Sequence, residues 1–234
     1  EFIGDISHEL KTPIFAIQGF IETLLNGALE DEEVNRDFLR KAMRNVNRLI
    51  YLTKDLMEIS KLETGELKSE IEDVYLYEVI HDIIESLKYK AERENISLTI
   101  HDFDKNMKVK ADKNQVKQVL INLIENAIKY NVPNGEVEVF VYVKPKQAER
   151  VFVAVKDTGI GLDEKDIPRI TARCFAGDKF RSRERGGTGL GLAIVKHIME
   201  AHGEQFLIES QPNKGSTFTI SLHRANAVQV WRDK

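Results

Sequence analysis

The chain has 234 residues, of which 42% are hydrophobic and 31% charged, and its formal net charge at pH 7 is −4. This balance offers no basic field for a nucleic acid partner. The single cysteine, Cys174, excludes an intramolecular disulfide and is typical of a reducing compartment. No apolar run approaches the roughly 20 residues that a membrane-spanning helix needs. The length allows two globular domains.

The sequence has no initiator methionine and begins inside an amphipathic pattern. We therefore interpret it as a fragment of a longer protein. We expect the fragment to be cytoplasmic, and the absent upstream part could hold sensor domains or membrane spans. We expect no direct membrane contact by the fragment itself, because it carries neither a spanning segment nor a signal peptide.

Two long helical patterns open the chain. Apolar residues recur every three or four positions in residues 3–24 and again in residues 38–59. Pro13 removes one backbone hydrogen bond and should kink the first helix. Two antiparallel helices cannot bury such wide apolar faces alone, so we predict that residues 1–63 form a hairpin that dimerises into a four-helix bundle. The alternative is a hairpin packed on its own C-terminal domain.

The rest of the chain mixes helical and strand patterns, which predicts an α+β fold. We expect a hinge at 64–67, a domain at 68–222 and a tail at 223–234 that carries no signal. The expected helices cover 79–89, 113–130, 167–170 and 189–202. The expected strands cover 97–100, 108–110, 137–143, 151–155, 206–209 and 217–222.

Asp157-Thr-Gly159-Ile-Gly161 follows an apolar run that predicts a buried strand. An aspartate at a strand end can accept a hydrogen bond from an exocyclic amine of a base, and glycines after it let backbone approach that base. The same pattern also fits a simple turn. Alone, the motif therefore leaves a nucleotide site and a turn as alternatives.

A second glycine-rich motif, Gly187-Thr188-Gly189-Leu190-Gly191, opens a predicted helix. Glycines let the backbone approach phosphates, and the unpaired N–H groups of a helix start attract anions. The motif lacks the Gly-Lys-Ser/Thr ending of a P-loop and does not follow a strand as a dinucleotide-binding fingerprint does.

A third motif places Asn122, Asn126 and Lys129 on neighbouring positions of one predicted helix. An amide oxygen is a hard ligand suited to Mg²⁺, and a lysine can balance phosphate charge. The alternative is a surface helix with solvated polar residues.

In this order, the three motifs resemble the N, G1 and G2 boxes of the GHKL ATPases, and specifically of sensor histidine kinases. The resemblance covers roughly residues 2–222 and implies an α/β sandwich of the Bergerat type that binds ATP and Mg²⁺. It implies a nucleotide site made of Asn122, Asn126, Lys129, Tyr130, Asp157, Gly159, Gly161, Gly187, Thr188, Gly189, Leu190 and Gly191. Within it, Asp157 would contact the adenine amine, Asn126 the metal, Lys129 the phosphates and Tyr130 the ribose and base. Asn122 stands where other GHKL ATPases carry a water-activating glutamate.

The N-terminal run from Phe2 to Pro13 resembles the H-box of the same family. A histidine is near half-protonated around neutrality, and its neutral nitrogen can attack a phosphoryl group. Glu9 can take the other ring proton of His8 as positive charge develops. By resemblance, Thr12 would position water when the partner protein is dephosphorylated.

The predicted lid after the Asp157 motif departs from the family pattern. Thr171 and Cys174 replace two phenylalanines, and Ala176 replaces an arginine. Lost aromatic packing and lost charge would weaken the lid and its contact with phosphate. Harmless drift in a loop is the alternative.

The sequence thus predicts ATP-dependent autophosphorylation of His8, transfer to an aspartate of a response regulator, and phosphatase activity towards that regulator. The expected partners are a second copy of the chain and the receiver domain of the regulator. Two alternatives remain: another kind of GHKL ATPase, and a phosphatase-biased or scaffold module with an impaired lid.

Overall fold

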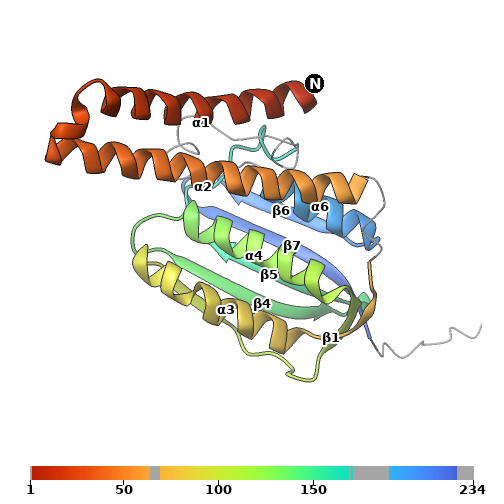
Figure 1. Ribbon diagram of the computed structural model, residues 1–234. Helices are drawn as coiled ribbons and strands as arrows, with labels where there is room; N and C mark the ends of the chain where they lie inside the picture. The colour runs from red at the N-terminus through yellow and green to blue at the C-terminus, as the bar shows by residue number, and fades with distance from the viewer. Residues whose placement is uncertain (1, 64–68, 169, 171–189, 226–234) are drawn as a thin grey trace, which may run out of the picture.

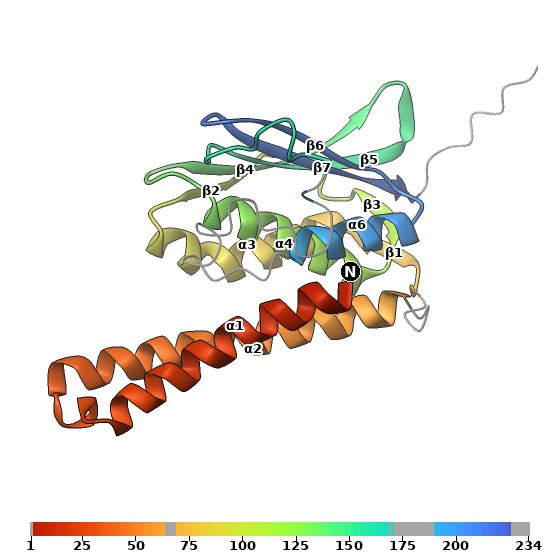
Figure 2. The same ribbon diagram turned by 90° about the horizontal axis from the view of Figure 1, so that it is seen from above.

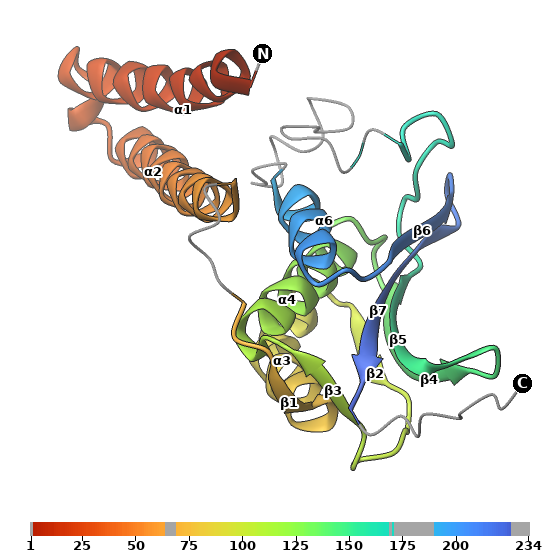
Figure 3. The same ribbon diagram turned by 90° about the vertical axis from the view of Figure 1, so that its right-hand side faces the viewer.

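The computed structural model describes residues 2–63, 69–168, 170 and 190–225. Figure 2 shows three layers: an N-terminal helical hairpin, a layer of three helices, and a sheet. In Figures 1 and 3, α2 lies between α1 and the helix layer.

The hairpin consists of α1 (Phe2–Leu25), the short helix η1 (Ala28–Glu30) and α2 (Glu32–Glu63). Gly27 turns the chain with φ 120°, a conformation that favours glycine. Asp31 then caps α2, because its Oδ1 accepts hydrogen bonds from the backbone N–H of Glu33 at 3.0 Å and of Val34 at 3.4 Å. The two predicted helices are confirmed. α1 continues through the buried Pro13, and the predicted kink there stays a prediction.

The hairpin contacts the rest of the molecule through α2, which packs on α6 (Gly191–Ala201). Leu52 of α2 is 5% exposed and joins the core of the sheet domain. The single chain therefore shows the packing that the sequence left as the alternative to a bundle. Large apolar side chains of the hairpin nevertheless stay exposed, namely Ile14, Phe15, Ile21, Leu25, Leu29, Leu39, Met43, Val46, Ile50, Tyr51 and Met57. Among the described helices, none combines the length and apolarity needed to cross a bilayer.

In the part of the chain that the structure describes, the sheet has seven strands, six of them in the order β1-β3-β7-β5-β4-β2, with β6 pairing β7. Neighbouring strands are antiparallel except β2 and β4, which are parallel. The strands are β1 (Glu72–Tyr75), β2 (Ser97–Ile100), β3 (Lys108–Ala111), β4 (Glu136–Lys144), β5 (Gln147–Asp157), β6 (Phe206–Gln211) and β7 (Gly215–Arg224).

Three helices cover one face of the sheet: α3 (Leu76–Arg93), α4 (Lys113–Lys129) and α6 (Figure 2). Alternate residues of the strands point to this face, as the twofold repeat of a strand requires. The core between the layers thus includes the buried valines of β4 and β5, Val137, Val139, Val151, Val153 and Val155. The predicted α+β class and the helix-on-sheet architecture are confirmed.

Several element boundaries differ from the sequence prediction. The expected helix at 167–170 is not tested in full, because residue 169 lies outside the described residues; residues 164–168 and 170 form turns, and the N–H of Ile170 is donated to the carbonyl oxygen of Asp166 at 2.9 Å. β1 was missed, because Val74 is its only buried residue and no alternation marks it. β7 extends past 222 to Arg224, since the backbone at 223–224 pairs with β3. α6 begins at Gly191 instead of 189, and α3 is longer at both ends than expected.

The start of α4 is fixed by the buried side chain of Asp112. Its Oδ1 accepts the backbone N–H of Asn114 at 2.9 Å and of Gln115 at 3.0 Å, which caps the helix. Its Oδ2 accepts the N–H of Glu70 at 3.0 Å, and its own N–H is donated to His202 Nε2 at 3.2 Å. One residue therefore joins the segment before β1, the start of α4 and the end of α6.

We expect Asp112→Ala to lower the free energy of unfolding by about 1–2 kcal/mol, because the cap of α4 is lost. Asp112→Asn is the matched control: it keeps the capping oxygen and loses only the acceptor for Glu70, so its loss should be smaller. Urea unfolding measures both variants. Equal stability of Asp112→Ala and wild type would contradict the capping role.

Candidate functional site

Asp157 ends β5 as a buried carboxylate. Its Oδ1 accepts the backbone N–H of Gly159 at 2.7 Å and of Ser216 at 3.2 Å. Burial raises the pKa of Asp157 to about 6, and the two backbone hydrogen bonds act in the opposite direction. Both donors use Oδ1, and no described residue donates to Oδ2. Asp157 therefore keeps one carboxylate oxygen for an outside donor.

The loop after Asp157 runs against the end of α4. The N–H of Ile160 is donated to the carbonyl oxygen of Tyr130 at 3.1 Å. A Cβ atom at Gly159 would overlap that same carbonyl oxygen, so only glycine permits this approach. Gly161 has φ 64°, and a Cβ there would overlap the carbonyl oxygen of Gln211, the last residue of β6 before the turn to β7. The glycines of the motif thus let the loop fit between α4 and this turn.

The polar residues of α4 line up toward its C-terminal end. Asn126 is partly buried and its side chain forms no hydrogen bond with a described residue. The Nζ of Lys129 lies 4.8 Å from the ring centroid of Tyr130, a cation–π contact. Because the Asp157 loop is bonded to the same end of α4, the structure brings these two predicted motifs together.

Asn122 differs from its neighbours, because its amide is already used. Its Nδ2 donates to the carbonyl oxygen of Gly191 at 3.3 Å, which ties α4 to the first residue of α6. Leu190, just before that helix, is 1% exposed. The first three residues of this motif, Gly187, Thr188 and Gly189, lie outside the described residues, as do the predicted lid residues Thr171, Cys174 and Ala176.

A polar network that the sequence did not reveal joins the loop after Asp157 to the segment between α4 and β4. Thr158 Oγ1 donates to Asn131 Oδ1 at 3.1 Å and accepts the backbone N–H of Glu136 at 2.8 Å. Ser216 is another residue that sequence reasoning missed, and it contributes a backbone N–H to Asp157. A backbone donor from a strand far away in the sequence leaves no mark in a motif, so no motif could have found it.

The predicted phosphoacceptor residues occupy the exposed side of α1. His8 is exposed, and Thr12 Oγ1 donates to the carbonyl oxygen of His8 at 3.1 Å. Glu9 turns instead toward α2, where its Oε2 lies 2.8 Å from Nη2 of Arg48. Since α2 lies between α1 and the helix layer (Figures 1 and 3), the structure does not bring His8 to the predicted nucleotide residues.

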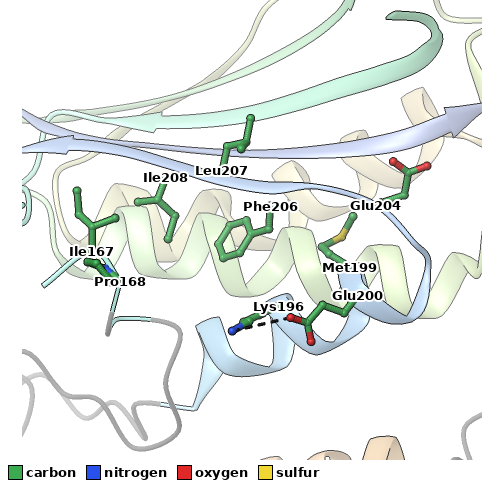
Figure 4. Close-up of a pocket in the computed structure, with 9 residues that line it drawn as sticks. All are labelled: Ile167, Pro168, Lys196, Met199, Glu200, Glu204, Phe206, Leu207 and Ile208. Carbon is green, nitrogen blue, oxygen red and sulfur yellow. Dashed lines mark ion pairs between the residues drawn. The ribbon is translucent and has the colours of Figure 1, made fainter.

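A shallow pocket of about 410 Å³ lies at another place, between α6, β6 and the turn before Ile170 (Figure 4). Phe206, Ile208 and Met199 form its apolar side, and Lys196 pairs with Glu200 at its edge, 3.8 Å apart. Of the predicted nucleotide residues that the structure describes, none lines it. Within the described ranges, no group of three His, Cys, Asp or Glu side chains could hold a metal ion. A metal at Asn126 would thus take an amide oxygen as its protein ligand.

Comparison with known families gives two matches along the chain. Residues 1–65 match the family described as His Kinase A (phospho-acceptor) domain. Residues 111–226 match the family described as Histidine kinase-, DNA gyrase B-, and HSP90-like ATPase. The first contains His8 and the second contains every residue of the predicted nucleotide site.

Individual proteins agree with these matches. The chain is 33% identical over 222 residues to the sensor histidine kinase WalK of Bacillus subtilis, which covers 95% of this chain and 36% of WalK. The chain spans 36% to 56% of the length of the first curated relatives that it matches. The described residues therefore correspond to a part of those proteins.

Solved structures give the same result. The Acinetobacter baumannii histidine kinase AdeS is 26% identical, with a TM-score of 0.69 over 94% of this chain and 98% of that chain. The histidine kinase ThkA, solved in complex with the response regulator protein TrrA, is 23% identical with a TM-score of 0.74, over 95% of this chain and 61% of that chain, and supports the fold alone. Because residues 1–65 match the phosphoacceptor family, residues 111–226 match the ATPase family and its relatives are named histidine kinases, the chain belongs to the sensor histidine kinases.

Proposed function

We propose that this chain uses ATP to phosphorylate His8 and passes the phosphoryl group to an aspartate of a response regulator. The observation that carries the proposal is the joining of the Asp157 loop to the end of α4, in a chain that also presents an exposed His8 next to a carboxylate. The family match over 111–226 supports the use of ATP.

In the proposed site, the free carboxylate oxygen of Asp157 accepts a hydrogen bond from the adenine amine. The polar end of α4 supplies Asn126 for the metal, Lys129 for phosphate and Tyr130 for the ribose and base. By the family resemblance, Gly187 to Gly191 would let the backbone approach the phosphates. Mg²⁺ bound at Asn126 would neutralise charge on the phosphates during transfer.

In the proposed reaction, a ring nitrogen of His8 forms a bond to the γ-phosphorus of ATP. The bond between that phosphorus and the bridging oxygen breaks, and ADP leaves. Glu9 takes the proton from the other ring nitrogen, and Thr12 positions water when the regulator is dephosphorylated. Because α2 separates α1 from the helix layer, this step requires the hairpin and the sheet domain to change their relative position, or His8 to meet the site of another copy.

A second copy of the chain is the proposed partner of the hairpin. The apolar side chains that stay exposed on α1 and α2 form the kind of surface that mates with another protein. Pairing them in a four-helix bundle would bury them. The response regulator is proposed from the family, through the match to a phosphoacceptor domain. The place in the cell, the cytoplasmic part of a longer sensor, stays a prediction.

We expect wild-type protein incubated with γ-labelled ATP and Mg²⁺ to acquire acid-labile label, and His8→Ala to acquire none, because phosphohistidine is the product. His81→Ala, which removes another exposed histidine, is the matched control and should label normally. ATP turnover without label would support another GHKL ATPase. Loss of phosphate from a phosphorylated regulator, without ATP turnover, would support a phosphatase-biased module.

Asn126→Ala should reduce labelling at least about tenfold, because the metal loses its protein ligand. The unfolding temperature should not change, since this side chain bonds to no described residue. Asn114→Ala, in the exposed first turn of the same helix, is the control. Normal labelling of Asn126→Ala would refute the metal role.

Adenine nucleotide affinity should fall as the pH is lowered through about 6, because protonated Asp157 no longer accepts the adenine amine. At pH 5 about one tenth of the carboxyl groups remain ionised, so the dissociation constant should rise about tenfold above its value at pH 7.5. Isothermal titration calorimetry measures it.

Asp157→Asn is the control for this pH effect, because ATP phosphate also titrates in the same range. The amide oxygen would still accept Gly159 and Ser216, so the amide NH₂ would face the adenine amine, donor to donor. Affinity should be weak at every pH, with no step near 6 beyond that of the nucleotide. An equal step in wild type and Asp157→Asn would contradict the role of this carboxylate.

A further inference from the structure

The carboxylate of Glu9 is held by a residue that the site does not otherwise use. Arg48 of α2 donates from Nη2 to Glu9 Oε2 at 2.8 Å. The side chains are 11% and 22% exposed, so the pair lies in the seam between α1 and α2 and is screened less than a surface pair. Glu9 is therefore turned to the inner side of α1, whereas His8 is exposed on the outer side.

The geometry of the ion pair is incomplete. A guanidinium can hold a carboxylate with two parallel hydrogen bonds. Here the contact uses Nη2 alone, and the Nε of Arg48 is buried without a hydrogen-bond partner among the described residues. An ion pair with one hydrogen bond opens more easily than one with two. The unpartnered Nε shows that the pair lacks the second hydrogen bond that a guanidinium and a carboxylate can form.

We propose that Arg48 is a positioning residue that competes with His8 for the carboxylate of Glu9. This inference rests on the proposed function and concerns its proton-accepting step. While Oε2 of Glu9 is bonded to Arg48 in the seam, Glu9 does not take the ring proton of His8. Autophosphorylation thus requires the pair to open, and the packing of α1 on α2 sets how often it does.

The pair also lies where a change in the hairpin would reach it. Glu9 belongs to α1 and Arg48 to α2, so any sliding or rotation between the two helices lengthens the contact of 2.8 Å. Pro13, which lacks the N–H that would bond to the carbonyl of Glu9, leaves the backbone just beyond Glu9 with one fewer helical bond. Both features favour a carboxylate that can be released without unfolding the helix.

The test is single-turnover labelling of the purified chain with γ-labelled ATP, comparing wild type with Arg48→Met. Methionine is a good helix former, and its side chain can fill the space of the aliphatic part of Arg48 between α1 and α2 without bonding to Glu9. We expect kcat, taken here as the rate constant of labelling at saturating ATP, to rise about three- to tenfold. This is the gain expected if the contact with Arg48 occupies Glu9 for most of the time in the wild-type protein. KM for ATP should stay unchanged, because the nucleotide residues lie in the other domain.

Arg44→Met, one turn earlier on α2 and exposed, is the matched control and should leave the rate at the wild-type value. Arg48→Lys keeps the positive charge and should therefore label as slowly as wild type, unlike Arg48→Met. If Arg48 only packed between the helices, the charge at this position would not set the rate. Arg48→Gln is the second variant if Arg48→Met does not fold, as judged by circular dichroism.

An unchanged or lower kcat in a folded Arg48→Met or Arg48→Gln protein would overturn the proposal. So would a change in KM for ATP alone. Absence of label on the wild-type protein would instead reject the proposed function. Normal wild-type labelling with no gain in the variants would reject the role of Arg48 and leave the proposed function standing.

Discussion

The approach of the Asp157 loop to the last turn of α4 determines where a nucleotide could sit. The carbonyl oxygen of Tyr130 accepts the N–H of Ile160 and leaves no room for a Cβ at Gly159. The contact is possible only because β5 and α4 are packed together through a core of buried aliphatic side chains, which supplies most of the driving force for folding. Apolar packing between the layers thus places a buried carboxylate and an amide-bearing helix side by side.

The residues of the proposed reaction lie in two separate parts of the molecule, the hairpin and the sheet domain. The carboxylate, the amides and the lysine belong to the sheet domain, whereas the histidine belongs to α1. The hairpin meets that domain through the packing of α2 on α6, with Leu52 entering the core. A contact made by one helix face is compatible with relative motion of the two bodies, which the proposed phosphorylation of His8 requires.

Much of the fold could be predicted because its signals are local. The helix periodicity of α1, α2 and α4 and the valine-rich strands β4 and β5 all lie within short windows of sequence. The residues of the candidate site were found as motifs for the same reason. Their bonds were not, because Asn122 meets Gly191 across 69 positions and Glu9 meets Arg48 across 39. β1 was missed since a strand with one buried residue has no pattern to detect.

The bond between Asn122 and the carbonyl oxygen of Gly191 has a consequence for how the enzyme could evolve. It needs a donor at position 122, and an amide supplies one. A glutamate there, the water-activating residue of other ATPases in the superfamily, would place carboxylate oxygens against that carbonyl, acceptor facing acceptor. A change of Asn122 to glutamate would therefore both favour ATP hydrolysis by water and weaken the attachment of α6 to α4. Selection for a stable contact between these helices thus also acts against hydrolysis.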